Sequence, residues 1–152
     1  MNDRDRLNGK MVIALWRSYY YAHKRSMSLF RENGLTMAQF TVMEALYNKG
    51  EMTVKQIVSR ILSSNGNMTV VIRNLEAAGL VLRRENPEDA RSFLISLTPK
   101  GHSVMDFVFP RHMQNFDEAF KNLTDQEKNT IISLLKKLET NSKKSKRMWQ
   151  TG

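Results

Sequence analysis

The side chains in this sequence that are best suited to chemistry are short polar groups in one run near its middle. Asn65, Gly66, Asn67 and Thr69 stand almost side by side, and Val70 follows them. Amide and hydroxyl groups both donate and accept hydrogen bonds, while a valine side chain offers methyl groups. Such groups can approach base edges in the major groove of DNA, where each base pair presents its own pattern of donors, acceptors and methyls. The run therefore predicts a contact surface for double-stranded DNA.

A helix has to carry these groups, and the sequence marks both of its ends. Ser64 stands where an N-cap residue is expected. Gly79 follows two alanines as a stop, because glycine tolerates the left-handed conformation that ends helices. The apolar residues between these ends recur at helical spacing: Met68, Val71, Ile72 and Leu75. We predict a helix with one buried face and with the polar run in its first turns.

The chain after Gly79 changes to the pattern of strands. Residues 80–84 and 93–97 are rich in Leu, Val, Ile and Phe, and residues 85–92 between them are polar and contain a proline. Two short helices are predicted before the polar run, over 36–48 and 53–61. Each begins with a capping box, in which a threonine and a glutamine satisfy each other's backbone amides. Helix, turn, helix and hairpin in this order are the arrangement of a winged helix-turn-helix.

Longer helices flank this central part. One is predicted over residues 5–31, ending at Gly34; another follows Pro99, with a kink expected at Pro110, and a last one begins at Thr124. The first has a broad apolar face: Val12, Leu15, Trp16, Tyr19, His23, Met27 and Phe30. One small wing domain does not cover so much apolar surface, which predicts dimerisation. Packing within a single chain is the alternative interpretation.

Composition limits the classes of function. The 152 residues carry a formal net charge of +9, concentrated in 1–34, 52–100 and 136–152. This favours an anionic partner such as nucleic acid, although the same excess would also serve solubility alone. No cysteine is present, which excludes disulfides and thiol-based catalysis or sensing. The three histidines lack metal-ligand spacing, and we find no phosphate-binding glycine loop or nucleophile motif, so we expect neither an enzyme nor a cofactor.

Targeting signals are the remaining feature of composition. No apolar run approaches the ~20 residues of a membrane span, and the N-terminal residues lack the apolar core of a signal peptide. We therefore expect a cytoplasmic protein.

Four short motifs stand in order over about forty residues around the predicted helix and hairpin. They are Asn65-Gly66-Asn67-Met68-Thr69, Leu75-Glu76-Ala77-Ala78-Gly79-Leu80, Asp89-Ala90-Arg91-Ser92 and Leu97-Thr98-Pro99-Lys100-Gly101. With the flanking helices they resemble the MarR family of bacterial transcriptional regulators over nearly the whole chain. The resemblance implies a mainly α fold with a small β-wing, in one domain over 1–152. Within it, 36–98 would form the winged helix-turn-helix, 5–34 and 100–140 the dimerisation helices, and 141–152 a basic tail.

The function that the resemblance implies is sequence-specific binding of double-stranded DNA by a homodimer. Such a regulator would be a repressor, released from a pseudo-palindromic operator when a small phenolic or quinone-like ligand binds. Two other classes remain open at this point. One is a non-specific basic nucleic-acid-binding or architectural protein, and the other is a winged-helix module that binds protein.

In a MarR-like complex, the first turns of the central helix would enter the major groove and the tip of the wing would enter the minor groove. Arg91 is the expected minor-groove residue, with Asp89 pairing with it to fix its direction. Serines and the amides at the two helix starts would bind phosphates. The full set predicted for DNA is Thr36, Thr53, Ser63, Ser64, Asn65, Gly66, Asn67, Thr69, Val70, Arg73, Asp89 and Arg91.

A ligand site is predicted where the dimerisation helices meet the DNA-binding part, because family members bind small aromatic compounds there. Its candidates suit a flat apolar ligand with one polar handle: Trp16, Tyr19, Tyr20, His23, Phe40, Met43, Glu44 and Met105. The alternative, which the spacing favours, is that this stripe is core, with His23 as a packing residue rather than a switch.

Overall fold

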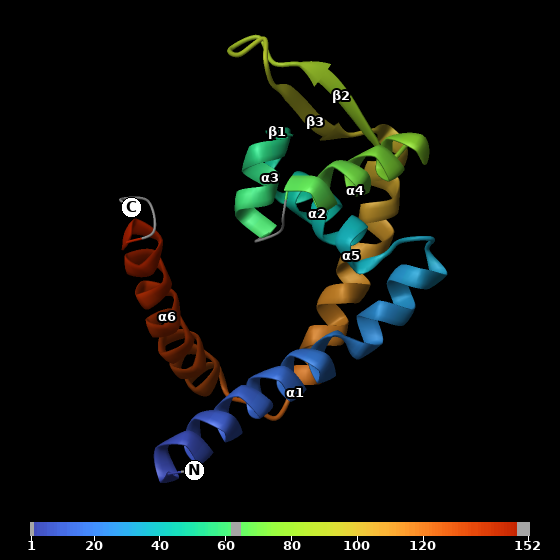
Figure 1. Cartoon of the computed structure of the whole chain (residues 1–152). Coiled ribbons are helices and arrows are strands. Elements are labelled where there is room, and N and C mark those ends of the chain that lie inside the picture. Colours follow the sequence, from blue (N-terminus) through green and yellow to red (C-terminus); the bar gives the residue numbers. More distant parts are fainter. Residues whose placement is uncertain (1, 62–64, 149–152) are drawn as a thin grey trace. The chain divides into compact units, whose positions relative to one another are not determined.

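The computed structural model describes residues 2–61 and 65–148, and for 65–66 and 139–148 it describes the backbone alone. The elements follow the order α1-α2-β1-α3-α4-β2-β3-α5-α6 (Figure 1). By its internal contacts the chain divides into two compact units, residues 1–116 and residues 117–152. The mainly helical fold with a small β-wing that the sequence predicts is confirmed.

Helix α1 (Asp3–Glu32) is the long N-terminal helix predicted over 5–31. A capping box begins it, because Asp5 N–H donates to Asn2 Oδ1 (2.8 Å) and Asn2 N–H donates to Asp5 Oδ2 (3.3 Å). The buried residues of α1 are Ala22, Ser26 and Phe30, all in its C-terminal part. Of the predicted apolar face, Phe30 is buried, and most of the residues before it are exposed in the chain: Val12, Trp16, Tyr19 and Met27.

Three short helices and a two-residue strand follow: α2 (Met37–Lys49), β1 (Met52–Thr53), α3 (Val54–Ile61) and α4 (Asn65–Ala77). Both predicted capping boxes form. Gln39 N–H donates to Thr36 Oγ1 and Gln56 N–H donates to Thr53 Oγ1, each at 3.2 Å. Helices α3 and α4 are the predicted helix-turn-helix pair, and α4 carries the polar run. The predicted N-cap Ser64 lies outside the described residues.

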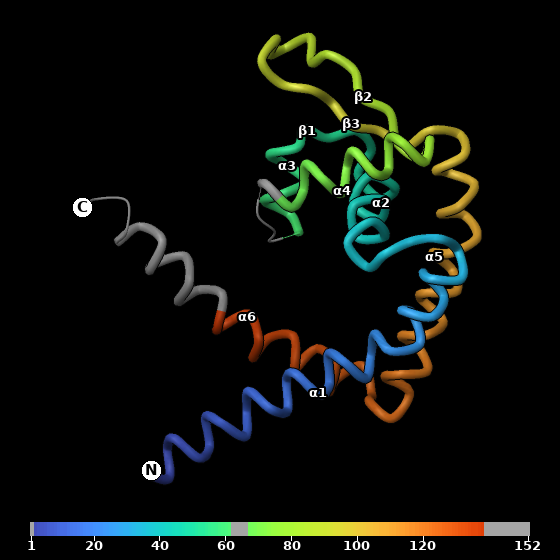
Figure 2. The backbone as a smooth tube through the Cα atoms, turned by 45° about the vertical axis from the view of Figure 1, so that its right-hand side comes forward, coloured from blue at the N-terminus to red at the C-terminus, as the bar shows by residue number. Residues whose placement is uncertain are grey.

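Strands β2 (Val81–Glu85) and β3 (Phe93–Leu97) pair antiparallel as predicted, from Val81 opposite Leu97 to Glu85 opposite Phe93. Their connecting loop extends away from the helices of the first unit (Figure 2). Strand β1 pairs with the other edge of β3, which gives the strand order β1-β3-β2. The sequence does not predict this third strand, because two residues are too few to show an alternating pattern.

Helix α5 (Pro99–Phe120) is a single helix that includes Pro110, so the expected kink does not divide it. Helix α6 (Asp125–Met148) begins at a third capping box, in which Thr124 N–H donates to Glu127 Oε2 (2.8 Å). Its backbone continues into the segment predicted as a tail, of which residues 141–148 are helical.

The core of the first unit packs α4 and the wing against the helices around them. Its fully buried side chains come from α1, α2, α3, α4, β3 and α5: Phe30, Phe40, Met43, Ile57, Met68, Ile72, Leu75, Ile95 and Met105. One face of α4 and the inner face of the wing therefore share a single apolar core. Within residues 2–61 and 65–148, no helix combines the length and the apolar character that crossing a membrane requires.

Candidate nucleic-acid interface

Helix α4 has two chemically different faces. The apolar residues that repeat at helical spacing are buried, as predicted: Met68, Val71, Ile72 and Leu75. Asn67, Thr69, Val70 and Arg73 are exposed, and Val70 keeps 44% of its surface accessible. An amide, a hydroxyl, methyl groups and a guanidinium together can contact the donors, acceptors and thymine methyls of a major groove. The structure thus brings four of the predicted DNA residues together on one helix face.

The start of α4 carries further predicted residues. Asn65 and Gly66 are its first two residues, so their backbone lies in the first turn. Ser63 and Ser64 fall outside the described residues, and their predicted phosphate contacts remain predictions.

The starts of α2 and α3 were predicted to bind phosphates through their amides. Thr36 N–H already donates to Gln39 Oε1 and Thr53 N–H to Gln56 Oε1, each at 2.8 Å. The backbone N–H of each glutamine donates to the hydroxyl of its threonine. Each capping box therefore uses two backbone N–H groups. The first-turn amides outside the capping boxes belong to residues 37–38 and 54–55. Thr36 and Thr53 therefore shape these helix starts instead of offering their own amides to DNA.

Arg91 is exposed in the loop between β2 and β3, where the sequence places the tip of the wing. The Asp89 carboxylate accepts a hydrogen bond from the Arg91 backbone N–H (3.1 Å), and the Asp89 carbonyl oxygen accepts one from Ser92 N–H (2.9 Å). The contact differs from the predicted pairing of Asp89 with the Arg91 guanidinium, because a short carboxylate readily closes a turn on the backbone two residues ahead. Asp89 therefore fixes the loop, and the guanidinium is left to face solvent.

Two further arginines of the wing are bound to carboxylates, which the sequence did not predict. Arg83 Nε lies 3.2 Å from Glu76 Oε1 at the end of α4. Arg84 Nε donates to Glu51 Oε2 (2.8 Å), and this contact lowers the pKa of Glu51. Arg84 and Glu51 lie 33 positions apart in the chain, so no local pattern indicates their pairing. These ion pairs fix β2 to the end of α4 and to Glu51, which precedes β1.

The predicted ligand residues do not share one environment. Three of them are fully buried in the core: Phe40, Met43 and Met105. Three others are exposed on α1: Trp16, Tyr19 and Tyr20. His23 and Glu44 are half-buried, and burial raises the pKa of Glu44, an effect that the nearby His23 opposes. The interpretation as core therefore holds for the first three residues.

A buried polar group lies near this region and was not singled out from the sequence. His112 of α5 places Nδ1 2.7 Å from Ser26 Oγ of α1, and Asn115 Nδ2 donates to the same hydroxyl (3.3 Å). Both His112 and Ser26 are buried. Burial, with a smaller contribution from His23, lowers the pKa of His112 to about 4. The ring is therefore neutral at physiological pH. A lone histidine 86 positions from its partner gives no sequence signal.

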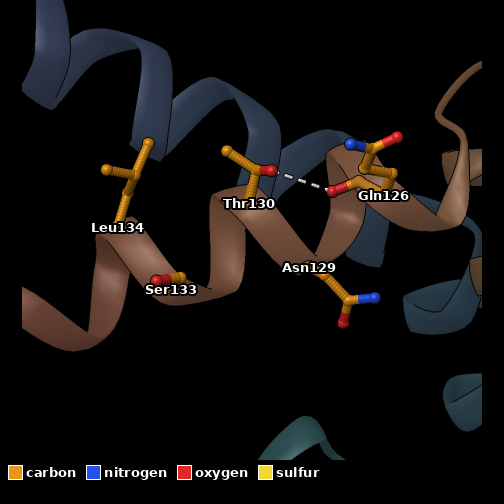
Figure 3. Close-up of a pocket in the computed structure, with 5 residues that line it drawn as sticks. All are labelled: Gln126, Asn129, Thr130, Ser133 and Leu134. Atoms are coloured by element: carbon orange, nitrogen blue, oxygen red, sulfur yellow. Dashed lines mark hydrogen bonds between the residues drawn. The ribbon is translucent and has the colours of Figure 1, made fainter.

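In the second unit, a shallow hollow lies along α6 alone. Figure 3 shows its lining residues on one side of the helix, with Thr130 Oγ1 donating to the Gln126 carbonyl oxygen (2.9 Å): Gln126, Asn129, Thr130, Ser133 and Leu134. One side of a single helix does not enclose a ligand, so this hollow is not a candidate site.

Comparisons with known proteins place these elements in a wider group. The sequence profile of the MarR family matches residues 35–93, which run from α2 into β3. The uncharacterised HTH-type transcriptional regulator YkoM of Bacillus subtilis (strain 168) is 36% identical, over 80% of this chain and 79% of its own. The HTH-type transcriptional regulator MhqR of the same organism is 31% identical, over 88% of this chain and 92% of its own.

A solved structure adds a three-dimensional likeness. BpsR of Bordetella bronchiseptica, whose DNA binding is regulated by 6-hydroxynicotinic acid, matches with a TM-score of 0.70 and 28% identity, covering 86% of this chain and 98% of BpsR.

Proposed function

The chain belongs to the MarR family of DNA-binding transcriptional regulators, and from that premise we propose that it represses transcription from a pseudo-palindromic operator as a homodimer. Two copies of α4 would enter successive major grooves, because half-sites of such an operator lie about one helical turn of DNA apart. The protein would act in the cytoplasm, where a bacterial chromosome lies.

The observation that carries this proposal is the exposed face of α4. Asn67, Thr69, Val70 and Arg73 stand on it, while the opposite face is buried in the core. A helix fixed by its core face keeps its exposed side chains in a constant direction, which direct contact with base edges requires. The exposed Arg91 at the wing tip adds a permanent positive charge for the narrow minor groove.

Homodimerisation is supported by the exposed apolar surface of α1. Large apolar side chains stay accessible along its N-terminal part: Leu7, Met11, Val12, Ile13, Trp16, Tyr19, Tyr20 and Tyr21. So many large apolar side chains on one helix are rarely left to water in a monomeric protein, and they indicate an interaction site. We therefore assign residues 5–31, together with 100–140, to the interface between two copies.

The most detailed part of the proposal is that a small aromatic ligand releases the protein from its operator. BpsR, 28% identical to this chain, is regulated by 6-hydroxynicotinic acid. In this chain, Trp16, Tyr19 and Tyr20 are aromatic and exposed, and the half-buried His23 and Glu44 supply polar handles. Since no cysteine is present, sensing would be non-covalent. A phenol or a hydroxylated aromatic acid fits this combination.

Fluorescence anisotropy tests the central claim. The protein is titrated on a duplex that it enriches from a random-sequence library, and on a scrambled duplex of the same composition at the same salt. We expect the enriched duplex to bind tighter by a factor of ~10³ or more. Equal affinities, or no enriched sequence, would instead identify a non-specific basic nucleic-acid-binding protein.

The ligand is tested on the same complex. We expect 6-hydroxynicotinic acid or a simple phenol, added at millimolar concentration, to lower the affinity for the enriched duplex. Benzene, which has the ring without the polar handle, is the control. If none of these compounds changes the affinity for the enriched duplex, the proposed release from DNA by these ligands is contradicted. The proposed binding to the operator is not affected by that result.

A further inference from the structure

We propose that Lys100, in the first turn of α5, is a positioning residue for operator recognition, because its ammonium binds the C-terminal end of α4 and not a DNA phosphate. Lys100 Nζ donates a hydrogen bond to the carbonyl oxygen of Ala78, at 2.8 Å. The inference rests on the operator binding proposed above. It concerns a cation that would otherwise be counted among the phosphate contacts of a basic DNA-binding protein.

The end of α4 explains why a cation belongs there. The last carbonyl groups of a helix have no partner within the helix and carry its negative partial charge. Leu80 N–H donates to the Leu75 carbonyl oxygen (3.0 Å) and Gly79 N–H to that of Glu76 (2.9 Å), so these two are satisfied where the chain turns at Gly79, whose φ is 68°. The carbonyl groups of Ala78 and Gly79 lie just beyond the last residue of α4, and their partners are Lys100 in the first turn of α5 and Thr98 immediately before it.

Thr98 binds the second of these carbonyl groups. Its Oγ1 donates to the Gly79 carbonyl oxygen (2.7 Å) and accepts from Gly101 N–H (3.0 Å), while its own N–H donates to the Leu80 carbonyl oxygen (3.1 Å). Gly101 allows this close approach, because a Cβ at that position would lie 2.1 Å from the Leu80 oxygen. Residues 98–101 therefore connect α5 to the end of α4 at three successive carbonyl groups.

The contacts of residues 98–101 lie at the opposite end of α4 from the side chains proposed to contact bases. Asn67 precedes Ala78 by eleven positions, which is about 16 Å along a helix axis. A small rotation at the C-terminal end is therefore carried to the base-contacting residues as a displacement, and contact with base edges tolerates only small errors of position. Loss of these contacts would lower the fraction of protein molecules in which α4 is correctly oriented. The apparent affinity for the operator falls in proportion to that fraction.

Two variants test the proposal. Lys100→Met removes the ammonium, and Thr98→Val removes the hydroxyl of the same connection without changing charge. Lys49→Met is the matched control, because Lys49 is an exposed lysine in the last turn of α2. Each is titrated by anisotropy on the enriched and scrambled duplexes over a range of salt concentrations. Thermal unfolding verifies that each variant is folded at the temperature of the titration.

We expect both Lys100→Met and Thr98→Val to bind the enriched duplex about tenfold more weakly, with affinity for the scrambled duplex changed less than twofold. The slope of log K against log salt should stay at the wild-type value, since no phosphate contact is lost. Lys49→Met should leave both affinities within about twofold of wild type.

Three outcomes would overturn the inference. If Lys100→Met weakens both duplexes alike and lowers the salt slope by about 1, Lys100 contacts a phosphate. If Lys100→Met and Thr98→Val bind the enriched duplex as wild type does, the connection does not position α4. If the wild-type protein enriches no sequence, the proposed function fails and this inference fails with it, whereas the first two results overturn the inference alone.

Discussion

Gly101 shows how a single residue sets the distance between two elements. A Cβ there would lie 2.1 Å from the Leu80 carbonyl oxygen, which only a backbone shift can relieve. Gly101→Ala should therefore lower the free energy of unfolding by about 2 kcal/mol, although alanine favours helix. Gly9 of α1 is the matched control, because nothing lies within 4 Å of its Cβ position, and Gly9→Ala should be neutral or stabilise by up to about 1 kcal/mol. Chemical denaturation compares them, and equal effects would contradict the steric argument.

His112 predicts how stability depends on pH. Burial lowers its pKa from 6.5 to about 4, so between these values the unfolded chain binds a proton that the folded chain does not. The free energy of unfolding should therefore fall as pH falls from 6.5 to 4, by up to about 3 kcal/mol over the whole window. Above pH 6.5 this contribution is constant.

The variant that isolates this effect is His112→Gln, which keeps a polar group near Ser26 but does not titrate. Denaturant titrations of both proteins at pH 7 and pH 4.5 measure the loss on acidification. We expect wild type to lose more than the variant, and the effect of Glu44, whose pKa is raised, is common to both. Equal losses in the two proteins would show that His112 is not responsible.

Helix α4 and the wing should make different contributions to DNA binding. Asn67→Ala removes an amide from the exposed face of α4 and should cost about 1–3 kcal/mol on the enriched duplex, with little change on scrambled DNA. Arg91→Ala removes a charge at the wing tip and should weaken both duplexes and reduce the salt slope. Anisotropy titrations at several salt concentrations measure both. An Arg91→Ala variant that binds like wild type would refute the minor-groove assignment.

The wing is held as an element by contacts that do not involve its tip. Arg83 pairs with Glu76 at the end of α4, and its guanidinium lies 5.2 Å from the centre of the Phe93 ring. Arg84 pairs with Glu51 before β1. Both arginines therefore orient the strands, and Arg91 is left as the wing arginine whose side chain is available to DNA.

At the scale of the whole molecule, dimerisation should depend on the apolar surface of α1. Val12 and Trp16 lie one helical turn apart and are 65% and 67% exposed. The double variant Val12→Glu, Trp16→Glu should be monomeric at micromolar concentration, because two carboxylates would have to be desolvated in the interface. Operator affinity should fall with it, since a monomer covers only one half-site.

Sedimentation velocity measures this prediction. The matched control places two glutamates four residues apart at Lys55 and Ser59, exposed residues of α3 that lie outside the proposed interface. We expect this control to sediment as a dimer. A monomeric wild-type protein, or a Val12→Glu, Trp16→Glu variant that still dimerises, would contradict the proposed interface.

The sequence by itself determined the helices, the starts of α2, α3 and α6, and the two faces of α4. The capping boxes of Thr36 and Thr53 form as predicted, and the buried residues of α4 are those spaced three and four apart. These signals are readable because a capping box and a helix face each depend on residues within about one turn of one another.

Only the tertiary structure decided which distant residues meet. Strand β1 forms because the fold brings Ile95 of β3 opposite Met52. The fold also brings Arg84 of β2 to Glu51, with which it forms an ion pair. The sequence also left undecided whether an apolar helix face is covered, since α1 repeats its apolar residues along its whole length but its buried residues lie only between Ala22 and Phe30. Likewise, Lys100 contributes one more positive charge in the sequence, and in the fold its ammonium binds a carbonyl at the end of α4. Local patterns fix what a segment can form, whereas its partners depend on where the rest of the chain places them.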